Sequence, residues 1–237
     1  MDTTLLAREL TDRLGLTRPP VGLAFVAEPP AGVERLTDAT PSACALWTRA
    51  EEGTFYASAE QHMNCPIGAT TMGFELPQAT QDTLMGLVEQ MCAERYIGPD
   101  EPPALPSVGR ASSGIVYGPL SELPLEPDVL LVWLSPAQAM IYNEAAGSAA
   151  WTSDGPAVYG RPTCAALPAA MAEGRPVMSL GCIGMRTFTQ TPPDLMLGVI
   201  PATEAPAFLE AIDTAVRANE AMRPFYEGQR ARFATAG

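Results

Sequence analysis

The sequence contains no lysine and only one histidine, His62, among its 237 residues. The absence of lysine excludes a pyridoxal Schiff base, a lysine nucleophile and a Walker A phosphate loop, because each of these needs the lysine amine. A single histidine excludes, within one chain, an HExxH zinc helix, a three-histidine zinc site and a facial triad with two histidines. Any histidine chemistry in this chain must therefore use His62.

Other features that mark particular protein classes are also missing. The chain has no GxGxxG, GxSxG or calcium-loop motif, so nothing supports a nicotinamide site, a serine hydrolase or an EF-hand. It has no apolar run of 18 residues, and its first ten residues carry acidic side chains without a cleavage site. We therefore expect neither a membrane span nor a secretory signal, and we expect a cytoplasmic protein.

Negative charge predominates: 27 acidic residues against 14 arginines give a net charge of −13. Nucleic acids and anionic membrane surfaces attract basic faces, so this balance disfavours both as partners. A content of 47% hydrophobic and 17% charged residues is typical of a folded globular chain. The length fits a single domain spanning residues 1–237.

Short apolar runs alternate with amphipathic segments, which predicts an α/β or α+β fold with a mixed sheet and flanking helices. The strongest strand signal covers residues 128–135, and Gly114 to Tyr117 is expected to form an edge strand. Further strands are expected at residues 21–26, 54–57, 176–180 and 195–200. Helices are expected over residues 79–96 and after residue 135, and a long C-terminal helix over 204–233 with an interruption at Pro224.

The order of features in the first half of the chain recurs in the second half. Each half contains an apolar strand, a cysteine that opens a helix, a Glu-Gly turn, a second strand and a cysteine followed by a glycine. The cysteines are Cys44 and Cys65 in the first half, and Cys164 and Cys182 in the second. This order predicts an internal duplication, with halves at approximately 18–98 and 113–200 packed about a pseudo-twofold axis.

Four of the five cysteines are therefore candidates for one shared site. Ser42 and Thr163 are expected N-caps, which places Cys44 and Cys164 in the first turns of helices. Helix N-termini favour the thiolate form that binds metal. An odd number of cysteines excludes full internal disulfide pairing. Cys92 lies outside the repeat, and we expect it to be a buried apolar side chain.

The segments around these cysteines resemble a known family. Those that carry the resemblance are Cys44-Ala45-Leu46-Trp47, His62 to Gly68, Pro136 to Met140 and Gly181 to Arg186. They are similar to the uncharacterised prokaryotic family called domain of unknown function 169 (DUF169), over about residues 18–200. The resemblance implies a soluble protein in which Cys44, Cys65, Cys164 and Cys182 bind an iron-sulfur cluster or another metal. It supplies no reaction.

Three further polar residues are candidates for the same site. His62, three residues before Cys65, is expected to act as a proton donor, ligand or cap, or else to be an exposed loop residue. Arg186, four residues after Cys182, would bind a substrate carboxylate or phosphate, or else form a structural ion pair. Gln138 would face a ligand crevice after the strongest strand, or else lie on an ordinary helix surface.

The first functional hypothesis is a cytoplasmic iron-sulfur protein whose four repeated cysteines hold one [4Fe-4S] cluster. It would transfer electrons, or carry out reductive or Lewis-acid chemistry on a small molecule, with His62 and Arg186 beside the cluster. One alternative is a non-catalytic protein that binds or carries a metal, cofactor or tetrapyrrole, including a structural four-thiolate zinc. Another is a thiol-dependent enzyme with Cys65 or Cys182 as nucleophile and His62 as base. The expected partner is a small molecule or an electron-transfer protein, and oligomer formation stays open.

Overall fold

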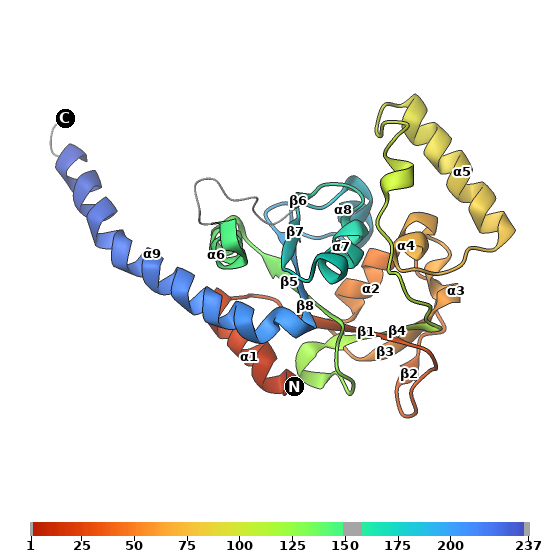
Figure 1. The fold of residues 1–237 in the computed structure, drawn as a ribbon, viewed down its shortest axis with the longest axis horizontal. Coiled ribbons are helices and arrows are strands. Elements are labelled where there is room, and N and C mark those ends of the chain that lie inside the picture. The colour runs from red at the N-terminus through yellow and green to blue at the C-terminus, as the bar shows by residue number, and fades with distance from the viewer. Residues whose placement is uncertain (1, 149–157, 235–237) are drawn as a thin grey trace.

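The computed structural model describes residues 2–148 and 158–234, and its fold is drawn in Figure 1. The strands of this part of the chain form one mixed eight-stranded sheet. The predicted mixed α/β class is therefore confirmed. The strands are β1 (Val21–Val26), β2 (Glu34–Arg35), β3 (Phe55–Ser58), β4 (Gly114–Pro119), β5 (Val129–Leu134), β6 (Val158–Tyr159), β7 (Val177–Ser179) and β8 (Met196–Pro201).

The strand order of one half of the sheet repeats in the other half. The complete order is β2-β3-β4-β1-β5-β8-β7-β6, and β1 and β5 are antiparallel neighbours at the centre. Outward from β1 come antiparallel β4, antiparallel β3 and parallel β2; outward from β5 come antiparallel β8, antiparallel β7 and parallel β6. The strands therefore follow the same order and directions outward from β1 and from β5, which is the arrangement expected of two halves related by a pseudo-twofold axis.

The boundary between the halves differs from the prediction. β4 was expected at an edge of the sheet and within the second half, but it lies between β1 and β3 with all six residues buried. It belongs to the first half because it pairs with β1 as β8 pairs with β5. Its first residue allows close packing against β3: a Cβ at Gly114 would lie 2.3 Å from the Ala57 carbonyl oxygen.

Helices cover both faces of the sheet. In β5, Val129, Leu131 and Trp133 point to the larger core under α2, α4, α7 and α8, whereas the alternate residues point to a second core under α1, α6 and α9. The helices are α1 (Thr3–Leu14), α2 (Ala43–Arg49), α3 (Ala59–His62), α4 (Pro66–Thr71), α5 (Gln78–Ala93), α6 (Pro136–Asn143), α7 (Ala166–Glu173), α8 (Ile183–Thr189) and α9 (Ala205–Ala234). No helix in the described ranges is long and apolar enough to cross a membrane.

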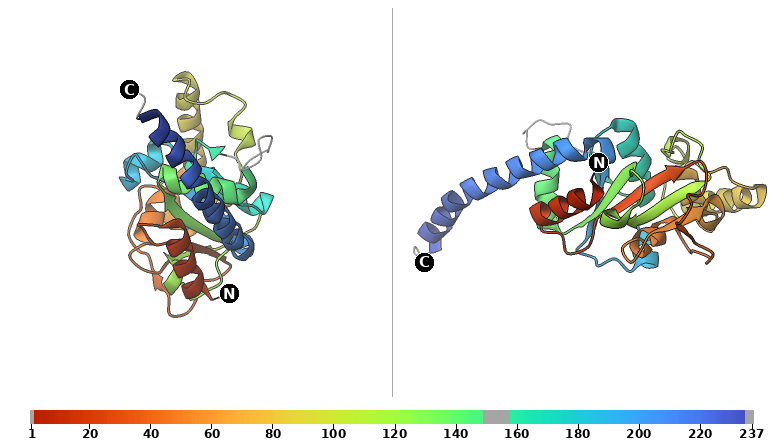
Figure 2. Two further views of the ribbon diagram at one scale, coloured as in Figure 1. Left: turned by 90° about the vertical axis from the view of Figure 1, so that its left-hand side faces the viewer. Right: turned by 90° about the horizontal axis from the view of Figure 1, so that it is seen from below.

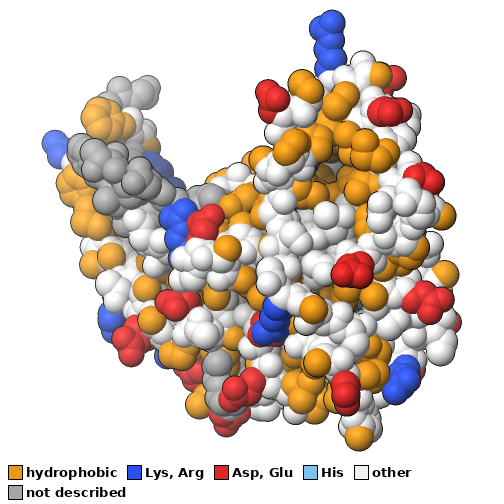
Figure 3. All heavy atoms as spheres, turned by 45° about the vertical axis from the view of Figure 1, so that its right-hand side comes forward, with side chains coloured by type: hydrophobic (Ala, Val, Ile, Leu, Met, Phe, Trp, Pro, Cys, Tyr) orange, Lys and Arg blue, Asp and Glu red, His pale blue; other side chains and the backbone are white. Residues whose placement is uncertain are grey.

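Two helices extend away from the sheet, as Figure 2 shows from two further directions. α5 contains no buried residue. In Figure 3, apolar side chains gather on the surface just below the projection at the top of the view. α9 continues through Pro224, so the predicted interruption is wrong. A proline in a helix removes one N–H donor and crowds the preceding turn. At Pro224 the helix is exposed on all sides, which leaves room for the ring.

Candidate functional site

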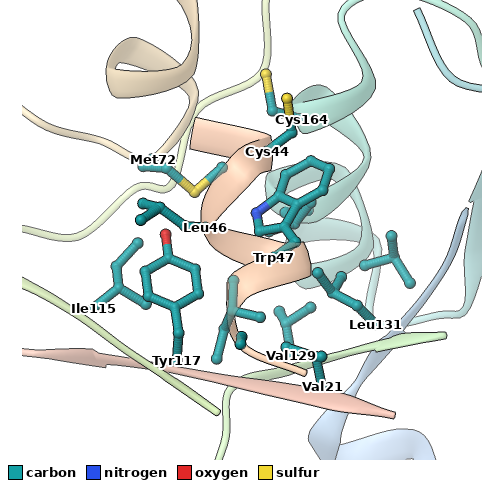
Figure 4. Close-up of a cluster of buried hydrophobic side chains, with 14 of the residues drawn as sticks. Val21, Cys44, Leu46, Trp47, Met72, Ile115, Tyr117, Val129, Leu131 and Cys164 are labelled. Carbon is teal, nitrogen blue, oxygen red and sulfur yellow. The ribbon is translucent and has the colours of Figure 1, made fainter. Parts of the chain in front are cut away.

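The four repeated cysteines come together on the sheet face that carries α2, α4, α7 and α8. Cys44 lies in the first turn of α2, and Cys164 lies in the 3-10 helix η4 (Thr163–Ala165) that leads into α7. Cys65 and Cys182 are the N-cap residues of α4 and α8. α2 packs against α4 and α8, and α4 packs against η4. Figure 4 shows the sulfur atoms of Cys44 and Cys164 side by side at one end of the core.

Gly68 allows the Cys65 segment to approach α2. A Cβ at Gly68 would lie 2.6 Å from the Ala43 Cβ and 3.0 Å from the Cys65 sulfur. Any side chain at position 68 would therefore push α4 away from α2. Because Ala43 directly precedes Cys44, this close contact holds the two cysteines of the first half near each other.

Buried hydroxyl groups form hydrogen bonds with Cys182 and Cys44. The Thr163 hydroxyl oxygen accepts a hydrogen bond from the Cys182 backbone N–H at 2.7 Å, which joins the two cysteine segments of the second half. Thr163 was expected to cap a helix, but the residue that precedes η4 is Pro162. Ser42 is the N-cap of α2, as predicted, and its hydroxyl also hydrogen-bonds the Cys44 thiol at 3.1 Å.

The four thiols form two pairs of different burial. Cys44 and Cys164, here named the inner thiols, are buried, whereas Cys65 and Cys182, the outer thiols, are half-buried. Burial is the main cause that raises the pKa of Cys44 to about 11; the Ser42 hydrogen bond lowers it, and charge at the outer thiols raises it. Burial also raises the pKa of Cys164 well above its usual range, again with a contribution from charge at the other three thiols. The inner thiols are therefore protonated at neutral pH and lie within electrostatic range of the outer thiols.

The four thiols do not form a single-ion site in the described structure. In residues 2–148 and 158–234, no three His, Cys, Asp or Glu side chains lie close enough to bind one ion. A tetrahedral zinc, with Zn–S bonds of about 2.3 Å, holds its thiolates about 3.8 Å apart. The four candidate donors are nonetheless all thiols, and one outer sulfur accepts a backbone hydrogen bond. Cys182 Sγ accepts a hydrogen bond from the Met185 N–H at 3.4 Å.

His62 is a core residue. Its side chain is 1% exposed, so an exposed loop position is wrong, and its ring packs against Phe74 at 4.7 Å between ring centroids. The Ser58 carbonyl accepts a hydrogen bond from Nδ1 at 2.7 Å, which leaves Nε2 to accept one from the Tyr117 hydroxyl at 2.9 Å. Burial lowers the pKa of His62 to about 4, so the ring is neutral at pH 7. With both nitrogens engaged, this placement supports a structural role.

Arg186 and Gln138 also bind the protein's own backbone. The Arg186 guanidinium donates to three carbonyl oxygens, those of Leu180 at 2.6 Å, Leu195 at 3.0 Å and Pro192 at 3.1 Å. It thereby holds the loop before β8 against the end of β7, through carbonyl groups and not through the ion pair that was the structural alternative. Gln138 completes the capping box of α6 and donates to the Gly15 carbonyl. Both side chains are engaged in holding the fold.

Two aromatic residues near the cysteines were not singled out from the sequence as site residues. The Tyr96 hydroxyl, just beyond α5, accepts a hydrogen bond from the Ile183 N–H at the start of α8, and charge at Cys182 contributes to a raised pKa of Tyr96, after burial. Trp47 lies one turn after Cys44 and is fully buried, and its indole N–H has no hydrogen-bond partner in the described structure. Cys92 is only half-buried on α5, because α5 projects from the core.

Comparison with known proteins places the chain in a family. Neither a curated protein nor a solved structure gives a significant match. The family model of DUF169, described as uncharacterised ArCR, matches residues 9–211. This range includes the eight strands of the sheet and all four cysteine segments. The chain therefore belongs to the DUF169 family.

Proposed function

We propose that this protein holds one [4Fe-4S] cluster between the two halves of its sheet, with Cys44, Cys65, Cys164 and Cys182 as ligands. Its role would be electron transfer, or reductive chemistry on a small molecule. The observation that carries the proposal is the convergence of four thiols from four separate segments, two from each half. Cysteines that serve only as small apolar side chains have no packing reason to gather at one place.

The chemistry of the donor set fits such a cluster. Soft thiolate ligands select iron-sulfur clusters, zinc or copper(I), and in the part of the chain that the structure describes no carboxylate acts on the Cys44 or Cys164 thiol to favour harder metals. Burial raises the pKa of Cys44 and Cys164, so both thiols would have to lose a proton on binding a metal or cluster. Binding would therefore release protons and stabilise the folded chain.

Four thiols from four separate segments suit a cluster better than a single zinc ion. One zinc needs its four sulfurs in mutual contact, and the described residues offer no such group. A cluster presents a separate iron to each thiolate, so it accepts ligands that lie farther apart. The alternative is a zinc ion bound by the same four cysteines, and metal analysis of the purified protein distinguishes the two.

The surroundings of the thiols suit a redox centre. Hydrogen bonds from the Met185 N–H to Cys182 and from Ser42 to Cys44 would tune the reduction potential of a cluster bound there. The half-buried outer thiols would place one edge of the cluster at the surface, where electrons can be exchanged. A thiol-dependent enzyme is less well supported, because both ring nitrogens of His62 are engaged and it cannot readily serve as the base.

The test is anaerobic purification of the full chain, followed by iron, sulfide and zinc analysis. We expect a brown protein with broad absorption near ~400 nm and about four irons and four sulfides per chain. Cys182→Ser should lower both contents, whereas Cys92→Ser, the matched control on α5, should leave them unchanged. A colourless, iron-free protein would overturn the proposal, and so would one zinc per chain without sulfide.

A further inference from the structure

The C-terminal half of α9 carries an apolar stripe that the described chain leaves uncovered. Met222, Phe225, Tyr226 and Phe233 are 48%, 56%, 64% and 76% exposed. Their spacings of three, four and seven residues place them on one side of the helix. Figure 2 shows this half of α9 reaching beyond the sheet and the other helices. Four large apolar side chains on one side of a free helix indicate a surface made for contact.

The stripe is continuous with the buried face of the same helix. Alternate steps of three and four residues, a heptad register, run through α9 from its buried start to its exposed end. The positions in this register are Ala205, Phe208, Ile212, Ala215, Asn219, Met222, Tyr226, Gln229 and Phe233. The hydrophobic residues in its first half are buried against the chain's own core. The second half has the same pattern, but none of its residues is buried against another helix of the described structure.

A groove beside the first half of α9 offers a matching surface. It lies between α9 and the π-helical turn η3 (Glu144–Ser148) and has a volume of about 420 Å³. The small side chains of its alanines leave space in the groove, and the carboxylate of Glu144 lies at its border. Its lining residues are Glu144, Ala145, Ala211, Thr214, Ala215 and Ala218. Two helices pack closely when the large side chains of one fit into the spaces between the small side chains of the other.

Charge identifies the occupant as a second copy of the chain. Residues 217–234 contain four arginines and two glutamates, although the whole chain has a net charge of −13. This half of α9 is thus basic on an acidic protein, and it is attracted to the body of another copy. As a continuous helix that leads away from the body, it cannot turn back into the groove beside its own first half.

We propose that two copies pair through antiparallel α9 helices, so that the exposed half of each helix lies in the alanine-lined groove of the other. With a twofold axis near Met222, Phe233 of one copy faces Ala211 of the other, and Tyr226 faces Ala218. Arg230 then lies near Glu144. The overlap covers about 23 residues of each helix, roughly 35 Å. Such an interface is isologous, because each copy contributes both the stripe and the groove.

The test is the mass of the full-length protein in solution, measured by sedimentation over a range of concentrations. We expect a dimer for the natural chain. Tyr226→Glu should raise the dimer dissociation constant at least ~30-fold, as substitution of a central aromatic contact does. Gly228→Glu is the matched control: it adds the same charge on another side of α9, where a side chain meets no other atom, and should leave the dimer intact.

A second variant tests the groove independently. Ala211→Trp fills the groove at a partly exposed position, so it should also dissociate the dimer, with an unchanged circular dichroism spectrum as evidence of folding. A natural chain that stays monomeric at every concentration would overturn the proposal. A dimer that survives Tyr226→Glu would do the same. If Tyr226→Glu dissociates the dimer but Ala211→Trp does not, the stripe contacts another surface, and the proposed pairing is wrong.

Discussion

The inner and outer thiols differ according to their place in the repeat and not according to the half that carries them. Cys44 and Cys164 are the first cysteines of their halves, and both are buried. Cys65 and Cys182 are the second cysteines, and both are half-buried N-cap residues. Equivalent residues that lie next to each other must lie near the axis that relates them, as the inner thiols do. The repeated strand order therefore places the four thiols in two chemical environments, each present twice.

A comparison of the two halves also indicates the role of the single histidine. His62 precedes Cys65 by three residues, and Ser179 precedes Cys182 by three. Both side chains are buried, and each hydrogen-bonds a backbone carbonyl, that of Ser58 or that of Tyr159. Both halves thus place a buried polar group at this position, and in each half a backbone carbonyl accepts its hydrogen bond. His62 fills that structural position in the first half.

The largest expected effect is the difference in iron content between a variant of an inner thiol and a variant of an outer thiol. Cys164→Ser should abolish cluster incorporation, because it removes a central ligand and buries a hydroxyl group in its place, which also lowers the free energy of unfolding by about 1–3 kcal/mol. Cys182→Ser should retain part of the iron, because its hydroxyl is half-exposed and three thiolates remain. Iron content and urea denaturation measure both effects. Equal losses from the two variants would remove the distinction between the pairs.

Alkylation of the metal-free protein should show the same distinction. At pH 8, Cys65 and Cys182 should react with iodoacetamide at least ~100-fold faster than Cys44 and Cys164, because the inner thiols are buried and protonated. With a pKa of about 11, Cys44 should react about tenfold faster for each unit of pH between 8 and 11. Mass spectrometry of the labelled peptides gives the rates. Similar rates for all four thiols would contradict the two environments.

His62 should make the stability of the protein depend on pH. Its pKa is about 4 when folded and about 6.5 when exposed, so the unfolded chain binds the proton more readily. The His62 contribution is complete above pH 6.5 and is lost as the pH falls toward 4, by up to about 3 kcal/mol. His62→Gln should reduce the difference in unfolding free energy between pH 7 and pH 4 by that amount. An unchanged difference would show that the ring is already protonated or exposed.

The smallest expected effect is a difference in stability between alanine variants of the two glycines that follow the outer thiols. Gly68→Ala should destabilise the chain by about 1–3 kcal/mol and lower its iron content, because the new Cβ would clash with Ala43. Gly184→Ala is the control from the other half: its Cβ would lie 3.9 Å from the Cys182 sulfur, an ordinary contact. It should be neutral or slightly stabilising, since alanine is the better helix former. Thermal unfolding of the two variants gives the comparison, and equal destabilisation would contradict it.

The sequence allowed the sheet and the cysteine cluster to be predicted because both follow from the order of features along the chain. The strand before each cysteine, the Glu-Gly turn and the second strand recur in order, whereas the pairing of β1 with β5 at the centre is known only from the structure. The roles of individual polar residues could not be predicted in this way. Arg186 and Gln138 find backbone carbonyls that only the folded chain brings within reach. Likewise, the central place of β4 in the sheet depends on its pairing with β1 and β3, which the sequence alone does not show.

The most direct test of the shared site is cysteine labelling of the anaerobically purified, iron-loaded protein under native conditions, with the metal-free protein as reference. Each of the five cysteines is quantified by mass spectrometry. We predict that Cys65 and Cys182, which react in the metal-free protein, become protected together on loading. The inner thiols should stay protected, and Cys92 should react equally in both samples. Protection of only one outer thiol would place the metal in a single half, and unchanged labelling of both would contradict a site built from four cysteines.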